Sequence, residues 1–165
     1  DEFLAFAYNE EQNLSVIIVR LFNTVGSRQT DKYGMVIPKL VKQALKNEVI
    51  TVFGDGNQTR CFISVKDVVE TLLKLIEKKE AYGDVFNVGS DEEVKVKDLS
   101  FKIKEITGSK SEIKFISPEE IYTSGFEDME RRVPDTSKIK KIIDFKIKYS
   151  LEDIIKDVVN YYKNQ

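Results

Sequence analysis

One apolar run limits the folds open to this chain more than any other feature. Residues Val16–Phe22 read Val-Ile-Ile-Val-Arg-Leu-Phe, so a strand formed by them is apolar on both faces. Such a strand is typical of the centre of a parallel sheet that helices cover on both sides. Burying each large apolar side chain contributes about 1.5–3 kcal/mol, so this strand needs neighbours. Arg20, in its middle, needs an ionic partner or a pocket.

Helix-type and strand-type patterns alternate along the chain, which predicts the α/β class. Phe3–Glu11 reads as a helix whose apolar residues cover more than one face, so we expect it inside a larger body or in an interface. A clear amphipathic helix, with Pro38 in its first turn, follows a loop through Tyr33. A later helix, over about Val65–Lys79, is expected to bury Val68, Leu72, Leu75 and Ile76.

Several of the remaining elements have clear end signals. A helix that carries Leu99 and Ile106 is expected to stop at Gly108, because glycine favours the left-handed position after a helix. Ser150 and Asp153 have the spacing of a capping box and predict the start of the last helix. The other expected elements are strands near Ile50–Phe53, Arg60–Ser64, Val85–Val88 and Ile113–Ile116, a polar loop before Val133, and a short helix opened by Pro134-Asp135-Thr136.

Composition excludes several classes of function. The sequence has 165 residues and a formal net charge of −2, without the basic excess that is usual for nucleic-acid binding. No apolar stretch in it reaches the ~18–20 residues that a membrane span needs. There is no histidine, which removes Ser-His-Asp chemistry and histidine-bearing zinc sites. Cys61 is the only cysteine, which excludes an internal disulfide and a thiolate metal cluster and fits a reducing cytoplasm.

Several segments together resemble one enzyme family. Arg20–Gly26 (Arg-Leu-Phe-Asn-Thr-Val-Gly) resembles the strand-to-loop signature of the extended short-chain dehydrogenases/reductases, usually Arg-x-x-Asn-x-x-Gly. Val52–Phe62 resembles their second nucleotide-contacting segment, and Val85–Ser90 and Arg131–Asp135 resemble the segments that follow it in the same order. The resemblance covers essentially the whole chain. UDP-glucose 4-epimerases and UDP-glucuronate decarboxylases are the most similar groups, and dTDP-glucose 4,6-dehydratases are more distant.

This resemblance implies the C-terminal half of a Rossmann-type enzyme. Residues 1–30 would be a remnant of the Rossmann domain, and residues 31–165 mostly the substrate-binding domain. Members of the family bind NAD with a Gly-x-x-Gly-x-x-Gly fingerprint and activate a sugar hydroxyl with a Tyr-x-x-x-Lys pair. We expect this chain to begin just after that lysine, with most of the NAD site outside it and no catalytic residue of its own. Tyr8 is followed four positions on by Gln12, and Gly54-x-Gly56 lacks a strand–turn–helix context, so neither replaces the missing parts.

The resemblance also implies a substrate site without a metal. Arg60 and Arg132 would grip the diphosphate of the nucleotide, and Asn23 would hydrogen-bond it. The other implied contacts are Thr51 and Phe53 around the uracil, Asp135 at the ribose, and Gln58 and Val36.

Each of these residues also has a plainer interpretation. Asn23 can cap its own turn, Arg60 can form a surface salt bridge beside a hairpin, and Phe53 can belong to the core. Asp135 can be the N-cap of the helix that follows, and Arg131 is an alternative to its neighbour as the phosphate contact.

The function implied is UDP-sugar binding for an NAD-dependent epimerase that oxidises the sugar at C4 and returns the hydride to the other face, most similar to UDP-glucose 4-epimerase. A UDP-glucuronate decarboxylase or a dTDP-glucose 4,6-dehydratase would share the pocket. A non-catalytic nucleotide-sugar-binding module is the alternative from another class. In the family, the helix that matches Phe3–Tyr8 helps to build a dimer interface, so we expect a homodimer or self-association and no nucleic-acid or membrane partner.

Overall fold

The apolar run forms strand β1 (Ile17–Leu21), which pairs in parallel with β6 (Asp84–Val88). The structure is a computed structural model, and it describes residues 1–30, 35–117 and 129–164. Within these residues, β1 pairs with β6 alone. Arg20 donates two hydrogen bonds of 2.7 and 2.6 Å to the carboxylate of Glu2, on helix α1 (Glu2–Gln12). The predictions of a parallel strand and of a paired arginine are both confirmed, whereas a central place for this strand in a sheet covered on both faces stays a prediction.

The other strands form three small sheets. Parallel pairs join β2 (Thr24–Val25) to β5 (Ile63–Ser64) and β3 (Ile50–Phe53) to β8 (Ile113–Ile116). In the third sheet, β4 (Thr59–Cys61) lies between antiparallel β7 (Glu93–Lys95) and parallel β9 (Arg131–Arg132). Short parallel pairs alternating with helices confirm the α/β class.

The turn between β3 and β4 does not close a hairpin, although its sequence permits one. Gly56 has a φ of 71°, and a Cβ there would lie 2.8 Å from the Cβ of Lys97. The main-chain nitrogen of Lys97 donates to the Gly56 oxygen at 3.0 Å. The turn therefore packs against the start of α4 (Val96–Thr107), and β3 and β4 go to different sheets.

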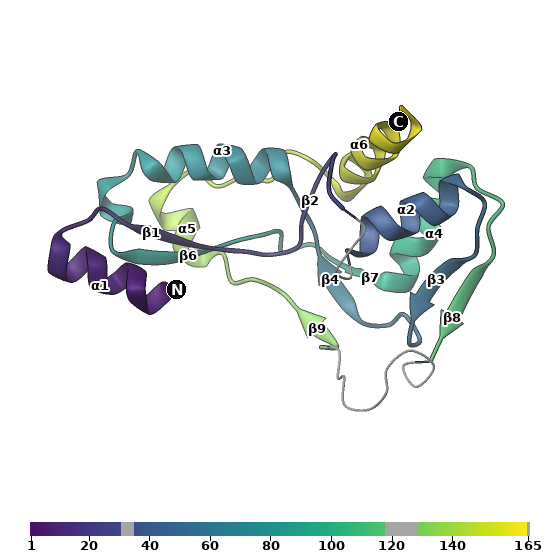
Figure 1. The fold of residues 1–165 in the computed structure, drawn as a ribbon, viewed down its shortest axis with the longest axis horizontal. Helices are drawn as coiled ribbons and strands as arrows, with labels where there is room; N and C mark the ends of the chain where they lie inside the picture. The colour runs from purple at the N-terminus through teal and green to yellow at the C-terminus, as the bar shows by residue number, and fades with distance from the viewer. Residues whose placement is uncertain (31–34, 118–128, 165) are drawn as a thin grey trace.

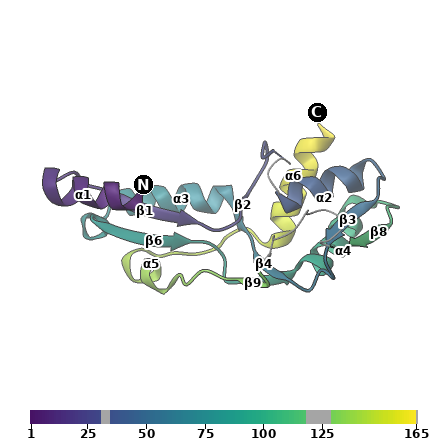
Figure 2. The same cartoon turned by 60° about the horizontal axis from the view of Figure 1, so that its bottom comes forward.

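Two hydrophobic cores lie at opposite ends of the molecule (Figures 1 and 2). The first joins α2 (Val36–Leu45), α4 and α6 (Leu151–Lys163) to β3. The second joins α3 (Val65–Ile76), the short helix η1 (Lys79–Ala81) and α5 (Ser137–Ile142) to β1 and β6. Strand β1 thus shares a core with residues 63–88 and 139–145, and a domain boundary at residue 30 remains a prediction.

The prediction that α3 buries Leu72 and Ile76 is wrong. Val68 and Leu75 are buried, but Leu72 is 39% and Ile76 64% exposed. The face of α3 that carries Val68 and Leu75 packs into the second core, and the neighbouring apolar face is exposed. The spacing of apolar residues predicts a helix here, but it does not show which of the two apolar faces of that helix packs inward.

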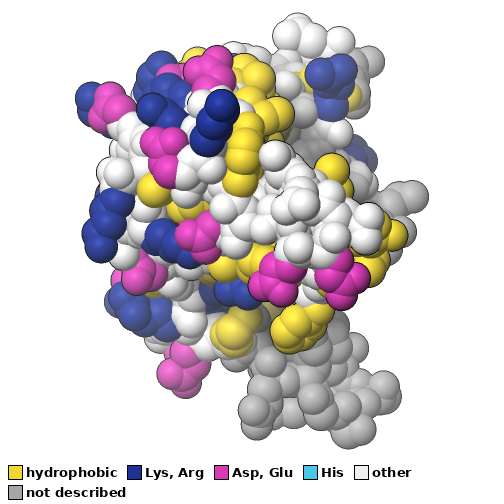
Figure 3. All heavy atoms as spheres, turned by 90° about the vertical axis from the view of Figure 1, so that its left-hand side faces the viewer, with side chains coloured by type: hydrophobic (Ala, Val, Ile, Leu, Met, Phe, Trp, Pro, Cys, Tyr) yellow, Lys and Arg dark blue, Asp and Glu magenta, His cyan; other side chains and the backbone are white. Residues whose placement is uncertain are grey.

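Helix α1 also exposes apolar side chains: Phe3 is 92%, Leu4 61% and Tyr8 50% exposed. The end of the molecule that carries α1 shows such side chains among charged ones (Figure 3). A place for α1 inside a larger body or an interface therefore remains a prediction.

The helix ends expected at Gly108 and Ser150 are confirmed. Gly108 has a φ of 65° and caps α4, and Ser150 and Asp153 form the capping box of α6. Strands β2, β7 and β9 were not predicted, because each has only two or three residues. Tyr33 and most of the predicted polar loop before Val133 lie outside the described residues.

Candidate functional site

Arg60 and Arg132 are direct register partners on the parallel strands β4 and β9. Residues in register on neighbouring strands project from the same face of a sheet, so the two guanidinium groups share one face. Arg60 also donates through Nη1 to the main-chain oxygens of Thr59 and Met129, at 2.8 and 2.7 Å. The fold thus brings together the two residues expected to grip a diphosphate.

Arg131 lies on the opposite face of the same strand and has a different partner. Its guanidinium donates to both carboxylate oxygens of Glu93, with the shortest contact at 2.6 Å. The Thr59 hydroxyl donates to the same carboxylate at 2.8 Å. The hydrogen bonds from Arg131 and then Thr59 hold the pKa of the Glu93 carboxyl below its usual range. This arrangement favours Arg132 over Arg131 as a ligand contact.

Arg132 lies over the ends of β1 and β6. Its guanidinium carbon is 5.2 Å from the centre of the Phe22 ring, within the range of a cation–π contact. Gly89 lies close to Phe22 as well: a Cβ added to it would come within 2.7 Å of the Phe22 Cβ and 2.8 Å of the Pro134 Cγ. Only glycine allows Phe22 and Pro134 to approach this closely from both sides.

Asn23 lies between β1 and β2. Its φ of 38° is in the left-handed region, where asparagine is tolerated better than most residues. Its Nδ2 donates to the Cys61 oxygen at 2.7 Å, and its main-chain oxygen accepts from Ile63. An amide nitrogen carries two hydrogens, so this bond leaves one for a ligand. The side chain ties two strands together and does not cap its own turn.

The residues expected around the base lie at α2 and β3. Thr51 exchanges hydrogen bonds of 3.0 and 3.1 Å with the side chain of Gln43. Phe53 is 36% exposed, and the Lys39 ammonium lies 4.0 Å from its ring centre. Burial lowers the pKa of Lys39. Both strand residues therefore face α2 and line the edge of the first core.

Val36 and Gln58 border the same region. Val36 begins α2 and packs against the first core. Gln58 is the residue before β4, and its side chain donates to the main-chain oxygen of Phe53, at the end of β3, at 2.9 Å. This hydrogen bond holds the end of β3, with Phe53, next to the start of β4, the strand that carries Arg60.

The carboxylate of Asp135 accepts a hydrogen bond from a residue two positions later in the chain. Its Oδ1 accepts from the Ser137 nitrogen at 2.8 Å, and this bond holds the pKa of its carboxyl below the usual range. The N-cap position itself is Thr136, one residue later than the sequence indicates. The main-chain oxygen of Asp135 accepts from Asn87 at 3.1 Å, which fixes this segment at the end of β6.

Two of the cavities lined by described residues do not include the predicted residues. One cavity of about 290 Å³ is lined by residues 24–29 and Val65, next to Asn23. A second of about 290 Å³ lies between α3 and α5, and none of the predicted residues lines either one. Phe22 and Gly89 lie in the family-like segments Arg20–Gly26 and Val85–Ser90, but the sequence did not predict them as site residues. The role of Glu93 had no signal in the sequence, because its partners lie on other strands.

The match to a family model decides the identity of the chain. The model described as the NAD dependent epimerase/dehydratase family matches residues 2–89. This chain belongs to that family. The match includes Asn23 and Arg60, whereas Arg132 and Asp135 lie beyond it.

Relatives of the family cover nearly all of the chain. The chain is 36% identical over 153 residues to a UDP-N-acetyl-alpha-D-glucosaminuronate decarboxylase of Bacillus cytotoxicus, covering 92% of the chain and 47% of the relative. A UDP-glucuronic acid decarboxylase of Danio rerio is 30% identical, with 99% of the chain and 37% of the relative covered. The chain thus spans about half or less of the length of the curated relatives it matches.

Solved structures of the family have the same fold. A UDP-glucuronic acid 4-epimerase of Bacillus cereus, solved with UDP-glucuronic acid and NAD, matches at 27% identity and a TM-score of 0.86. A UDP-glucose 4-epimerase of Thermotoga maritima, solved with UDP-glucose, matches at 30% identity and a TM-score of 0.86. Each match covers 99% of this chain and 50% of the other. This half of the Rossmann-type epimerase fold is therefore present here.

The Gly54-x-Gly56 turn does not have the context of a pyrophosphate cradle for NAD. Gly54 and Gly56 lead into strand β4 and not into a helix, and Gly56 packs on Lys97. The dinucleotide fingerprint needs a helix N-terminus at the turn. Among the described residues there is no group of three or more side chains able to hold a metal ion, and no helix is long and apolar enough to cross a membrane.

Proposed function

We propose that this segment binds the nucleotide part of a UDP-sugar for an NAD-dependent epimerase/dehydratase. The observation that carries the proposal is the placement of Arg60 and Arg132 in register on one face of β4 and β9. Asn23 approaches the same strand through its bond to the Cys61 oxygen. Two permanent positive charges next to an amide donor match the charge and acceptors of a diphosphate.

The base would lie on the α2 and β3 side of this clamp. Phe53 offers a partly exposed ring, and Thr51 lies two residues before it on the same face. Gln58 would hold the edge of this surface and Val36 its apolar border, with Asp135 toward the ribose. Binding a remote nucleotide firmly leaves the reacting sugar free to be oriented elsewhere, which is an effective use of binding energy.

NAD would supply hydride transfer when bound, and most of the groups that hold it would come from outside this segment. The residues of this chain would bind and orient the substrate and take no part in moving protons. The assembled enzyme would be a homodimer with no nucleic-acid or membrane partner, in the cytoplasm.

The sugar and the reaction are further parts of the proposal. Several curated relatives are named UDP-glucuronic acid decarboxylases, and one matching structure is a UDP-glucuronic acid 4-epimerase. These names favour a UDP-sugar that carries a carboxylate. UDP-glucose 4-epimerase remains the alternative, supported by the match to the Thermotoga maritima structure. Turnover of UDP-glucuronic acid and of UDP-glucose, measured after the NAD-binding half of a relative is supplied in trans, distinguishes the two, because the uronate should be the better substrate only in the first case.

Calorimetric titration of the chain with UDP and with uridine tests the phosphate clamp. UDP should bind more tightly, and Arg60→Ala or Arg132→Ala should each weaken UDP binding by about 1.5–3 kcal/mol, the range for hydrogen bonds to charged groups. Lys141→Ala, which removes a positive charge from α5, is the matched control and should change little. Equal affinity of the folded chain for UDP and uridine would contradict the proposal.

A non-catalytic binding module is the competing function. It would bind UDP equally well but would gain no turnover when the NAD-binding half of a relative is supplied in trans. Turnover of a UDP-sugar under those conditions would favour the enzyme segment.

A further inference from the structure

One carboxylate connects all three strands of the sheet that carries the proposed clamp. Glu93 is on β7, and it accepts hydrogen bonds from Thr59 on β4 and from Arg131 on β9. Its partners share the face opposite Arg60 and Arg132. The carboxylate therefore does not compete with a ligand for the two clamp arginines.

Strand β9 is short, so side-chain contacts contribute to holding it in place. It has two residues, Arg131 and Arg132, and pairs with β4 alone among the described strands. At its start, the Thr59 nitrogen donates to the Glu130 oxygen at 2.8 Å, and Arg60 Nη1 donates to the Met129 oxygen at 2.7 Å. A pair of strands this short is marginal without side-chain support.

Arg131 and Arg132 are adjacent, so fixing one side chain on its face directs the other to the opposite face. The two-pronged contact between Arg131 and Glu93 is a geometry that restricts both the position and the rotation of the guanidinium group. A slip of β9 by one residue would place Arg131 beside Arg60 and turn Arg132 away.

We propose that Glu93 is a positioning residue: by holding Arg131 and Thr59 on one face of the sheet, it sets the register in which Arg132 lies beside Arg60 on the other. This inference rests on the proposed phosphate clamp and adds to it a residue that touches no ligand. Glu93 acts on UDP only through the placement of Arg132.

The test is a calorimetric titration of Glu93→Gln with UDP and with uridine. The glutamine keeps the size of the side chain and one acceptor but loses the charge and the second acceptor. We expect UDP to bind about three- to tenfold more weakly, as for the loss of a partly exposed charged pair, while uridine binding stays the same. The matched control is Glu92→Gln, at an exposed neighbouring position, which should leave both affinities unchanged.

A double-substitution cycle separates positioning from a general structural effect. In a chain that already carries Arg132→Ala, Glu93→Gln should weaken UDP binding by less than about twofold, because the group it positions is gone. Equal weakening of UDP and uridine, or full additivity with Arg132→Ala, would overturn the inference. If Arg60→Ala and Arg132→Ala themselves leave UDP binding unchanged, the proposed clamp fails instead. If they weaken it and Glu93→Gln does not, only the role of Glu93 is wrong.

Discussion

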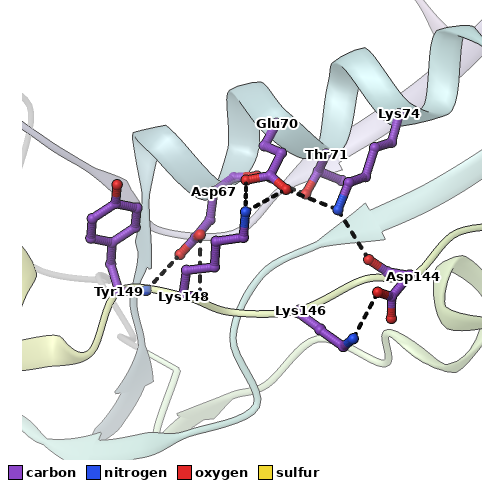
Figure 4. Close-up of polar contacts among 8 residues, drawn as sticks. All are labelled: Asp67, Glu70, Thr71, Lys74, Asp144, Lys146, Lys148 and Tyr149. Atoms are coloured by element: carbon purple, nitrogen blue, oxygen red, sulfur yellow. Dashed lines mark hydrogen bonds and ion pairs between the residues drawn. The ribbon is translucent and has the colours of Figure 1, made fainter.

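The carboxylate of Asp67 accepts a hydrogen bond of 3.2 Å from the main-chain nitrogen of Lys148 (Figure 4). Asp67 is only 2% exposed, on the first turn of α3, and it accepts a second bond of 3.3 Å from the Tyr149 nitrogen. These bonds attach the segment before α6 to α3. A buried carboxylate that pairs two otherwise unsatisfied donors is costly to remove.

Asp67→Ala should therefore lower the free energy of unfolding by about 1–3 kcal/mol, because it leaves two part-buried N–H groups without this acceptor. Urea denaturation followed by circular dichroism measures the change. Asp98→Ala is the matched control, since Asp98 lies in the first turn of α4 but is exposed, and it should cost much less. Equal losses would mean that the helix dipole, and not the bonds to residues 148 and 149, explains the effect.

The stability of the chain should depend on the ionisation of Asp157. Burial by itself raises the pKa of this carboxyl, but the hydrogen bonds from Lys66 and Ser27 outweigh it, so the pKa lies below its usual range. Stability from a carboxylate with a lowered pKa is fully present above the unfolded value of about 3.9 and is lost as the pH falls through the folded value.

Asp157→Asn should reduce stability at neutral pH and should flatten the loss of stability on acidification below about pH 4. Urea denaturation at several pH values measures both effects. Asp98→Asn serves as the control at an exposed position. A variant with the same pH dependence as the parent chain would exclude a contribution from the contacts of Asp157.

Cys61 should be unreactive in the folded chain. Its side chain is buried, and burial, followed by the charge of Glu93, raises the pKa of the thiol to about 11. Alkylation by iodoacetamide needs the thiolate, so labelling near pH 8 should be slow in buffer and fast in denaturing urea. Lys110→Cys in a Cys61→Ser chain places a thiol at an exposed position as the control and should label quickly in both. Rapid native labelling of Cys61 would show that this part of the sheet opens readily.

The exposed apolar face of α3 should cause self-association. It consists of Val69, Leu72, Leu73 and Ile76, which are 50%, 39%, 62% and 64% exposed. Their spacing of three and four residues forms one continuous stripe, and surfaces of this kind normally mark contacts. Light scattering should report a dimer or a larger species at high concentration.

Leu73→Lys should raise the apparent dissociation constant of that association about tenfold or more, as expected for one large buried side chain. Phe101→Lys is the control, because Phe101 is 55% exposed on α4, away from the stripe. A monomer that binds no hydrophobic dye would contradict the prediction.

Much of the candidate site could be predicted from motifs because they fall in continuous stretches. The segment around Asn23 and the segment that ends at Arg60 were identified in this way. Their meeting could only be expected by resemblance, since it depends on the pairing of β2 with β5 and of β4 with β9. Sequence patterns also could not show that Asp135 would bond to Ser137 and leave the N-cap position to Thr136.

The sequence by itself determined the type and most of the ends of the longer elements, because periodicity, glycine at Gly108 and the capping box at Ser150 act within a few residues. It also determined the family, through short motifs in a fixed order. Only the tertiary structure decided which face of α3 is buried, that β3 and β4 go to different sheets, and that Arg132 and not Arg131 lies beside Arg60. These outcomes depend on strand pairing and packing between residues far apart in the chain, and such contacts leave no periodic trace in the segments that make them.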